Sequence, residues 1–257
     1  MRLILLRHGQ TPSNLSNLLD TAEPGPGLTE LGLAQAAAVP AALAGEDITA
    51  VYASSQTRAQ LTAEPLAAAR GLAVQVRRGL REISAGTLEM QNSREAIMGY
   101  LGVARQWLQG ATDVRMPGAD SGDEVLERFD AVVREVEESA RGGTVVIVSH
   151  GAIIRTWSAL RVENLDPAHP EIYELSNTGA VVLEGSMGTP RKEHGDGNGD
   201  GHRDTGGWTC LDWRSQAIGG AVLADPETDG PLADTGADGP GAGAPQADPE
   251  QARDATR

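Results

Sequence analysis

Three short apolar segments of the sequence end in polar residues that strand packing does not require. The first ends in Arg-His-Gly at residues 7–9, and another ends in Ser-His-Gly at residues 149–151. A third is followed by two serines and then by Arg58, in the first turn of an expected helix. If these segments are parallel strands of one sheet, their carboxyl ends meet at one edge. Two histidines, two arginines and a helix N-terminus would then line one pocket.

These residue types suit the binding of a phosphoryl group. The planar guanidinium of Arg7 or Arg58 can donate two hydrogen bonds to phosphate oxygens. A helix N-terminus adds free N–H groups and the positive end of the helix dipole. The arginines also disfavour protonation of a neighbouring imidazole, so His8 or His150 would tend to stay neutral and nucleophilic. The glycine after each histidine removes a Cβ from the approach path.

Each histidine alone has a simpler explanation, because a single histidine at a strand end is more often a structural residue than a catalyst. The same arrangement at the ends of two separate segments, with Arg58 near the end of a third, makes chance placement the weaker explanation. We therefore expect one site that contains Arg7, His8, Arg58 and His150.

Strand-like segments alternate with helical patterns along most of the sequence. The segments are bounded by Gly, Pro, Ser or charged residues, and they are Leu3–Leu6, Thr49–Ala53, Leu72–Val76 and Thr144–Val148. Alternation of this kind favours βαβ units. We predict an α/β fold, a three-layer αβα sandwich with a mostly parallel central sheet, and a ligand crevice at the carboxyl ends of its strands.

The helical patterns carry start and stop signals. Residues 121–124 form an S-x-x-E capping box ahead of apolar residues at helical spacing. Another helix is expected over 57–70, with Ser54 or Ser55 as its cap and a kink at Pro65.

The last third of the chain changes in character. Segments 179–184 and 208–213 are expected to be late strands, in a hairpin at the sheet edge, and a Gly- and Asp-rich insertion at 188–206 separates them. We predict a catalytic domain over 1–220 that contains this insertion as a disordered loop. Residues 221–257 are rich in Asp, Pro, Gly and Ala and are expected to form an acidic disordered tail.

Composition excludes several classes of protein. The 257 residues carry a formal net charge of −15, and without a basic run a nucleic-acid partner is not expected. No apolar stretch approaches the roughly 18 residues of a spanning helix, so we expect no membrane association. The single cysteine, Cys210, is compatible with a reducing compartment, and we predict a cytoplasmic protein.

Four stretches of the sequence resemble the histidine phosphatase superfamily, the phosphoglycerate mutase-like group of branch 1. They occur in the family's order over roughly residues 1–185, and they read LILLRHGQTPSN, YASSQTRAQLTAEPLA, LREISAGTLE and VVIVSHGAIIR. The resemblance implies the phosphoglycerate mutase-like fold.

The resemblance also implies a role for each residue that matches a family motif. His8 falls on the nucleophile, and Arg7, Arg58 and His150 match the residues that complete the phosphate pocket. Asn14 matches a polar contact to the phosphate.

The remaining matches are an acid and two minor phosphate contacts. The family's proton donor falls on Glu82, although Glu89 lies near enough in sequence to compete. Thr11 and Gly151 are lesser candidates for phosphate contacts.

By resemblance, the chain is a metal-independent hydrolase of the histidine acid phosphatase type. It would hydrolyse a small phosphomonoester through a phosphohistidine on His8, with no cofactor. Ligation of a metal by His8, His150 and Glu82 is disfavoured, because two arginines at the same place would repel a divalent cation.

Two departures from the family pattern favour a phosphatase over a mutase. The stretch LLDTAEPGPGLTELG lacks the Gly-Arg element typical of the mutases, and the longer mutase-specific segment has no counterpart. Phosphoglycerate mutase-type phosphoryl transfer stays an alternative. A non-catalytic phosphate-binding module is the other, although the intact set of matching residues argues against it.

Overall fold

A computed structural model of the chain describes residues 1–139, 142–168, 173–188 and 207–231. Its centre is a six-stranded sheet with the strand order β3-β2-β4-β1-β5-β6. The strands are β1 (Arg2–Arg7), β2 (Ile48–Ser54), β3 (Val74–Arg77), β4 (Thr144–Ser149), β5 (Ala180–Gly185) and β6 (Trp208–Arg214). Strands β1 to β4 are parallel to one another, whereas β5 and β6 form an antiparallel hairpin at the edge. The mostly parallel sheet and its edge hairpin are both confirmed.

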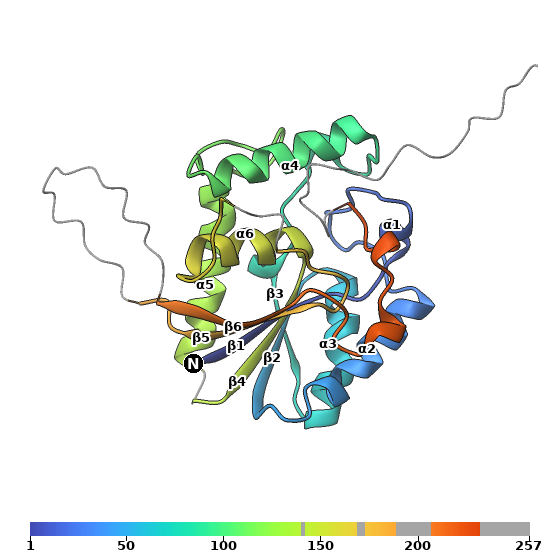
Figure 1. Cartoon of the computed structure of the whole chain (residues 1–257), viewed down its shortest axis with the longest axis vertical. Coiled ribbons are helices and arrows are strands. Elements are labelled where there is room, and N and C mark those ends of the chain that lie inside the picture. The colour runs from blue at the N-terminus through green and yellow to red at the C-terminus, as the bar shows by residue number, and fades with distance from the viewer. Residues whose placement is uncertain (140–141, 169–172, 189–206, 232–257) are drawn as a thin grey trace, which may run out of the picture.

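Helices cover both faces of this sheet (Figure 1). One face packs against α2 (Glu30–Ala42) and α3 (Thr57–Arg70), and the other against α4 (Arg94–Leu108), α5 (Gly122–Ser139) and α6 (Gly151–Arg161). Alternate residues of β1 enter the two cores, with Leu3 and Leu5 on one side and Ile4 and Leu6 on the other. All four leucine and isoleucine side chains are fully buried, so β1 holds its tip between two packed layers. The predicted three-layer αβα sandwich is confirmed.

The strand order brings the polar strand ends together, as the sequence predicts. Strand β4 lies between β2 and β1 and is parallel to both, and Arg7 is paired with Ser149. The backbone N–H of His8 donates to the carbonyl of Ser149 over 3.0 Å. His8 and His150 therefore leave neighbouring strands at the same edge.

One predicted helix cap is confirmed and another is corrected. The capping box predicted at residues 121–124 is present at the start of α5, where the N–H of Ser121 donates to the Glu124 carboxylate and the N–H of Glu124 donates to the Ser121 hydroxyl. Helix α3 begins instead after Gln56, which makes no side-chain cap, because Ser54 and Ser55 lie in the turn that precedes it. The helix runs on through Pro65, and Gly71 ends it in the left-handed conformation at φ 66°.

Residues 221–231 differ from the expected start of a disordered tail. They form two short 3₁₀ turns, η4 (Ala221–Leu223) and η5 (Pro226–Thr228), and Figure 1 shows this orange-red segment beside α2 and the short helix α1 (Pro12–Leu15). Gln35 donates to the carbonyl of Leu223, and Gln10 to the hydroxyl of Thr228. Hydrogen bonds of this kind hold the segment against the domain, and amino-acid composition does not reveal them. The rest of the expected tail, and residues 189–206 of the expected insertion, lie outside the described residues.

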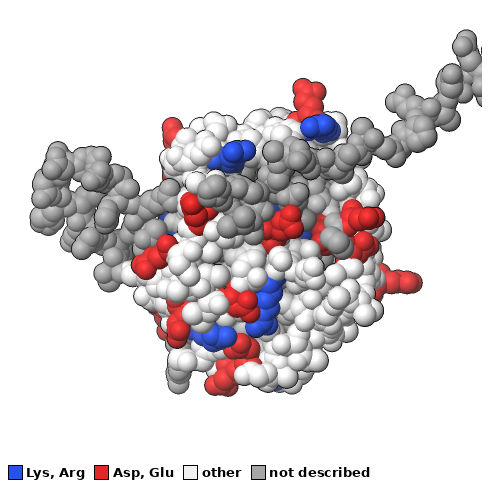
Figure 2. Space-filling model, in the orientation of Figure 1, with Lys and Arg blue, Asp and Glu red and all other residues white. Residues whose placement is uncertain are grey.

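Within the described part of the chain, no helix is long and apolar enough to cross a membrane. Figure 2 shows one face of the molecule, on which basic side chains stand in small separate groups among acidic ones. The absence of a nucleic-acid partner stays a prediction.

Candidate active site

His8 is the first residue after β1, and its ring is held by the backbone of the next residue. The Nδ1 atom lies 2.8 Å from the carbonyl oxygen of Gly9. A carbonyl oxygen can only accept, so Nδ1 carries the proton and Nε2 keeps its lone pair. Gly9 is needed for packing, because a Cβ there would lie 2.7 Å from the carbonyl oxygen of Gly32 in α2. The side chain of His8 thus presents a neutral ring nitrogen that can act as a nucleophile.

His150 lies beside His8 at the N-cap of α6. The two ring centroids are 5.2 Å apart and His150 is fully buried. Among the described residues neither of its ring nitrogens has a hydrogen-bond partner. A buried imidazole without a partner is costly, so these nitrogens are candidates to bind a polar ligand, although His150 itself is not among the residues that line the pocket with His8.

Burial and nearby arginines keep both imidazoles neutral. Burial, followed by the charges of Arg58 and Arg7, holds the pKa of His8 well below its usual range. Burial is also the first cause that lowers the pKa of His150, with Arg58 and His8 next. The expectation that Arg7 and Arg58 disfavour protonation of a neighbouring histidine agrees with these directions.

Arg7 and Arg58 are both buried and both keep an unpaired N–H. Arg7 donates to the carbonyl of Leu175 over 2.6 Å and to that of Asp229, and Arg58 donates to the carbonyl of Asp20 over 3.1 Å. Within the described chain, the Nε of Arg7 and the Nη1 of Arg58 have no partner. Two buried cations with spare donors form a place for an anion.

Helix α1 carries two more of the predicted residues. The Thr11 hydroxyl accepts from the backbone N–H of Asn14, and the Asn14 side-chain oxygen accepts from the backbone N–H of Thr11. The Thr11 hydroxyl also donates to that oxygen over 3.0 Å, so it is used by the cap. With its oxygen turned to Thr11, Asn14 has its amide N–H groups left for a ligand. Asn14 is therefore the better placed of the two for a phosphate contact.

The Glu82 carboxylate sits on the N-terminus of α6. Its Oε1 accepts from the N–H groups of Ile83 and Ile153, each over 2.9 Å, and its Oε2 accepts from that of Ala152 over 3.1 Å. Glu82 and Gly151, the first residue of α6, both line the pocket with His8. The local fold thus holds one carboxylate at the pocket wall.

Glu89, the competing acid, has a different position. It accepts hydrogen bonds from the N–H groups of Thr21 and Ala22 and from the Thr21 hydroxyl, and it is not among the lining residues. Glu89 therefore ties down a loop away from the pocket, whereas Glu82 lines it.

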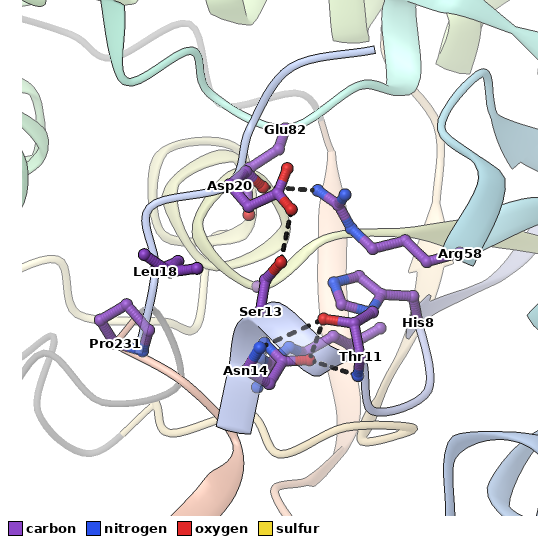
Figure 3. A pocket seen from close by; sticks show the side chains of 11 residues that line it. His8, Thr11, Ser13, Asn14, Leu18, Asp20, Arg58, Glu82 and Pro231 are labelled. Carbon is purple, nitrogen blue, oxygen red and sulfur yellow. Dashed lines mark hydrogen bonds between the residues drawn. The ribbon is translucent and has the colours of Figure 1, made fainter. Parts of the chain in front are cut away.

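One pocket gathers most of the predicted residues and several that the sequence did not single out (Figure 3). The predicted residues in its lining are Arg7, His8, Thr11, Asn14, Arg58, Glu82 and Gly151. The additional ones are Ser13, Leu18, Asp20 and Pro231. Ser13 and Asp20 follow the Arg-His-Gly motif but have no distinctive spacing, and Pro231 is far away in sequence. Neither a strand-end motif nor a helix-capping pattern distinguishes these residues in the sequence.

Among the described residues, no group of three or more His, Cys, Asp or Glu side chains is arranged to hold a metal ion. The pocket offers the neutral imidazole of His8, the guanidinium groups of Arg7 and Arg58, and two carboxylates, Asp20 and Glu82, at the carboxyl edge of a parallel sheet. Groups of these types can bind a phosphoryl group and offer a ring nitrogen to it.

The family model for the histidine phosphatase superfamily (branch 1) matches residues 3–195. The chain belongs to this superfamily, as its motifs predict.

Two curated relatives show how far this similarity extends. The PE-PGRS family protein PE_PGRS11 of Mycobacterium tuberculosis is 35% identical over 233 residues, which are 85% of this chain. The chain spans only 37% of the length of that relative. A probable phosphoglycerate mutase, GpmB of Salmonella choleraesuis, is 31% identical over 59% of this chain and 70% of its own length.

Solved structures with the same fold include mycobacterial proteins. Mycobacterial glucosyl-3-phosphoglycerate phosphatase, in complex with VO3, is 27% identical with a TM-score of 0.63, and the alignment covers 84% of this chain and 99% of that one. The structure described as mycobacterial hydrolase 2 is 26% identical with a TM-score of 0.66, and the alignment covers 86% and 94% of the two chains.

Proposed function

We propose that the protein is a phosphomonoesterase that hydrolyses a small phosphorylated metabolite through a phosphohistidine at His8. One observation carries the proposal. The neutral imidazole of His8 lies in a pocket with two buried arginines, each of which keeps an N–H without a partner in the described chain. The similarity to glucosyl-3-phosphoglycerate phosphatase supports hydrolysis of a phosphomonoester.

In the first step, the lone pair on Nε2 of His8 attacks phosphorus and the bond to the ester oxygen breaks. Glu82, in its protonated form, gives its proton to that oxygen, and the alcohol leaves. Arg7, Arg58 and His150 hold the equatorial oxygens, where negative charge is spread in the transition state. Asn14 and the start of α6 at Gly151 would add N–H groups to the same oxygens.

In the second step, water attacks phosphorus and Glu82 takes a proton from it. The bond between phosphorus and Nε2 breaks, which returns a neutral His8 and releases inorganic phosphate. Every proton and bond is accounted for by these side chains, so the proposed reaction is metal-independent. We place it in the cytoplasm, as the sequence predicts.

Phosphoryl transfer of the mutase type is the second candidate, because GpmB is named as a probable phosphoglycerate mutase. A mutase returns the phosphoryl group to a substrate, whereas a phosphatase gives it to water. Release of inorganic phosphate separates the two.

The test is turnover of a panel of phosphomonoesters by the wild type and by His8→Ala, with and without a chelator. We expect phosphate release by the wild type, unchanged by the chelator, and loss of at least about 10³-fold in His8→Ala. His202→Ala is a control outside the described residues. Undiminished hydrolysis in His8→Ala would overturn the mechanism, and net transfer without phosphate release would favour the mutase.

A further inference from the structure

Asp20 is a pocket residue that the proposed mechanism does not use. It lies in the loop after α1 and lines the same pocket as His8 and Glu82. Figure 3 shows it bridging two other lining residues, because its carboxylate accepts from the Ser13 hydroxyl and its carbonyl oxygen accepts from Arg58. These contacts hold the Asp20 carboxylate in place in the pocket wall.

The charges of the pocket leave no cation for a second anionic group. Its lining contains two cations, Arg7 and Arg58, and two carboxylates, Asp20 and Glu82. In the described chain no other Lys or Arg lines it. A bound phosphate carries between one and two negative charges at neutral pH, and it uses both arginines. Asp20 then stays in the pocket wall as a negative charge whose neighbouring cation, Arg58, is shared with the phosphate.

The remaining lining residues also favour an uncharged substrate group. Leu18 and Pro231 add apolar surface, and Ser13 adds a hydroxyl. The Asp20 carboxylate also lies close to Arg58. Burial lowers the pKa of Arg58, and the negative charge of Asp20 is the largest charge effect that raises it again. A substrate carboxylate near the phosphate would therefore meet Asp20 in a partly desolvated pocket, where like charges repel strongly.

We propose that Asp20 is a specificity-determining residue that selects phosphomonoesters of uncharged alcohols, such as polyols, against phosphomonoesters that also carry a carboxylate, as 3-phosphoglycerate does. This inference rests on the proposed function. It separates the chain from the glucosyl-3-phosphoglycerate phosphatase that shares its fold, since phosphoglycerate carries such a carboxylate.

Two ligands with the same carbon skeleton test the proposal on the whole 257-residue chain. Glycerol 3-phosphate has a hydroxymethyl group where 3-phosphoglycerate has a carboxylate. Each is measured as a competitive inhibitor of p-nitrophenyl phosphate hydrolysis, so the comparison does not require that either is turned over. We expect the wild type to bind glycerol 3-phosphate at least about tenfold more tightly.

Substitutions at position 20 separate charge from shape. Asp20→Asn should reduce the ratio of the two inhibition constants at least about fivefold, mainly through tighter binding of 3-phosphoglycerate. Asp20→Glu keeps the charge and should keep the preference. Asp113→Asn removes the same charge at an exposed position outside the pocket and should leave the ratio unchanged.

The outcomes are distinguishable. A wild-type preference for 3-phosphoglycerate, or the same ratio in Asp20→Asn, would overturn the role of Asp20 while phosphatase activity stands. Loss of all turnover in Asp20→Asn, with vanadate binding retained, would place Asp20 in the catalytic machinery and also overturn the proposal. Absence of any hydrolysis by the wild type would instead contradict the proposed function. The wild-type ratio decides the matter if the variant does not fold.

Discussion

At the scale of single residues, the site works by keeping two imidazoles neutral. His8 and His150 lose the stabilisation that water gives to a charged ring, and two guanidinium groups beside them oppose a further positive charge. The hydrogen bond from Nδ1 of His8 to Gly9 then leaves the reactive lone pair on Nε2. The arginines that we propose to bind the phosphate are thus the same ones that help to keep the proposed nucleophile neutral.

We predict that His8 stays neutral at pH 6, where a histidine with the ordinary pKa of about 6.5 is mostly protonated. Because the pKa of His8 in the folded state is lowered, its contribution to stability is complete above pH 6.5 and declines as the pH falls toward the folded-state pKa. NMR titration of the ring protons, with His8→Gln to assign the signal, measures this directly. A midpoint at or above 6.5 would contradict the electrostatic account.

At the scale of elements, helix α5 holds the loop that carries Glu82. This helix packs on the face of the sheet opposite to α2 and α3. Arg128 of α5 donates to the carbonyls of Gly79 and Arg81, each over 2.7 Å, and to that of Glu82 over 3.0 Å. Tyr100 of α4 donates to the next carbonyl, that of Ile83. Burial lowers the pKa of Arg128 to about 10, so the group stays charged at neutral pH.

We therefore predict that Arg128 is a positioning residue for Glu82. Lysine cannot make the same three hydrogen bonds, so Arg128→Lys should lower kcat about tenfold for an alkyl phosphate with little change in KM. The effect should be much smaller for p-nitrophenyl phosphate, whose leaving group needs no proton. Arg134→Lys, at an exposed position of the same helix, is the control. Equal losses on both substrates would indicate a merely structural role.

The site residues that follow the strands could be predicted from the sequence, whereas the loop residues that form the pocket wall could not. Parallel strands share one carboxyl edge, so the sequence places Arg7, His8 and His150 at that edge, and they come together because β4 lies next to β1. Asp20 and Pro231 enter the pocket through loop packing, which no periodicity records. The start of α3 also differs from the prediction, because β2 continues to Ser54 and the N-cap falls on Gln56.

At the scale of the whole molecule, the end of the described chain returns to the active site. Asp229 is buried, its carbonyl accepts from Arg7, and its carboxylate accepts from the backbone N–H of Asn177 over 2.9 Å. Asn177 in turn donates to the carbonyl of His8 over 3.0 Å. Residues more than two hundred positions apart in the sequence thus share one network.

We predict that Asp229→Ala lowers the free energy of unfolding by about 1–3 kcal/mol, because it leaves a buried N–H without an acceptor. Glu227→Ala, at an exposed position two residues earlier, should change it by less than about 0.5 kcal/mol. Urea unfolding followed by circular dichroism measures both. Equal stability of the two variants would show that the segment does not pack on the site in solution.

The central claim is that His8 becomes covalently phosphorylated during turnover. Rapid acid-free quenching of the enzyme with a radiolabelled phosphomonoester, followed by peptide mapping, tests it most directly. The account predicts a label on His8 that is stable to alkali and lost in acid, and that is absent from His8→Ala. Steady turnover with no label on His8, or a label that persists in His8→Ala, would contradict it.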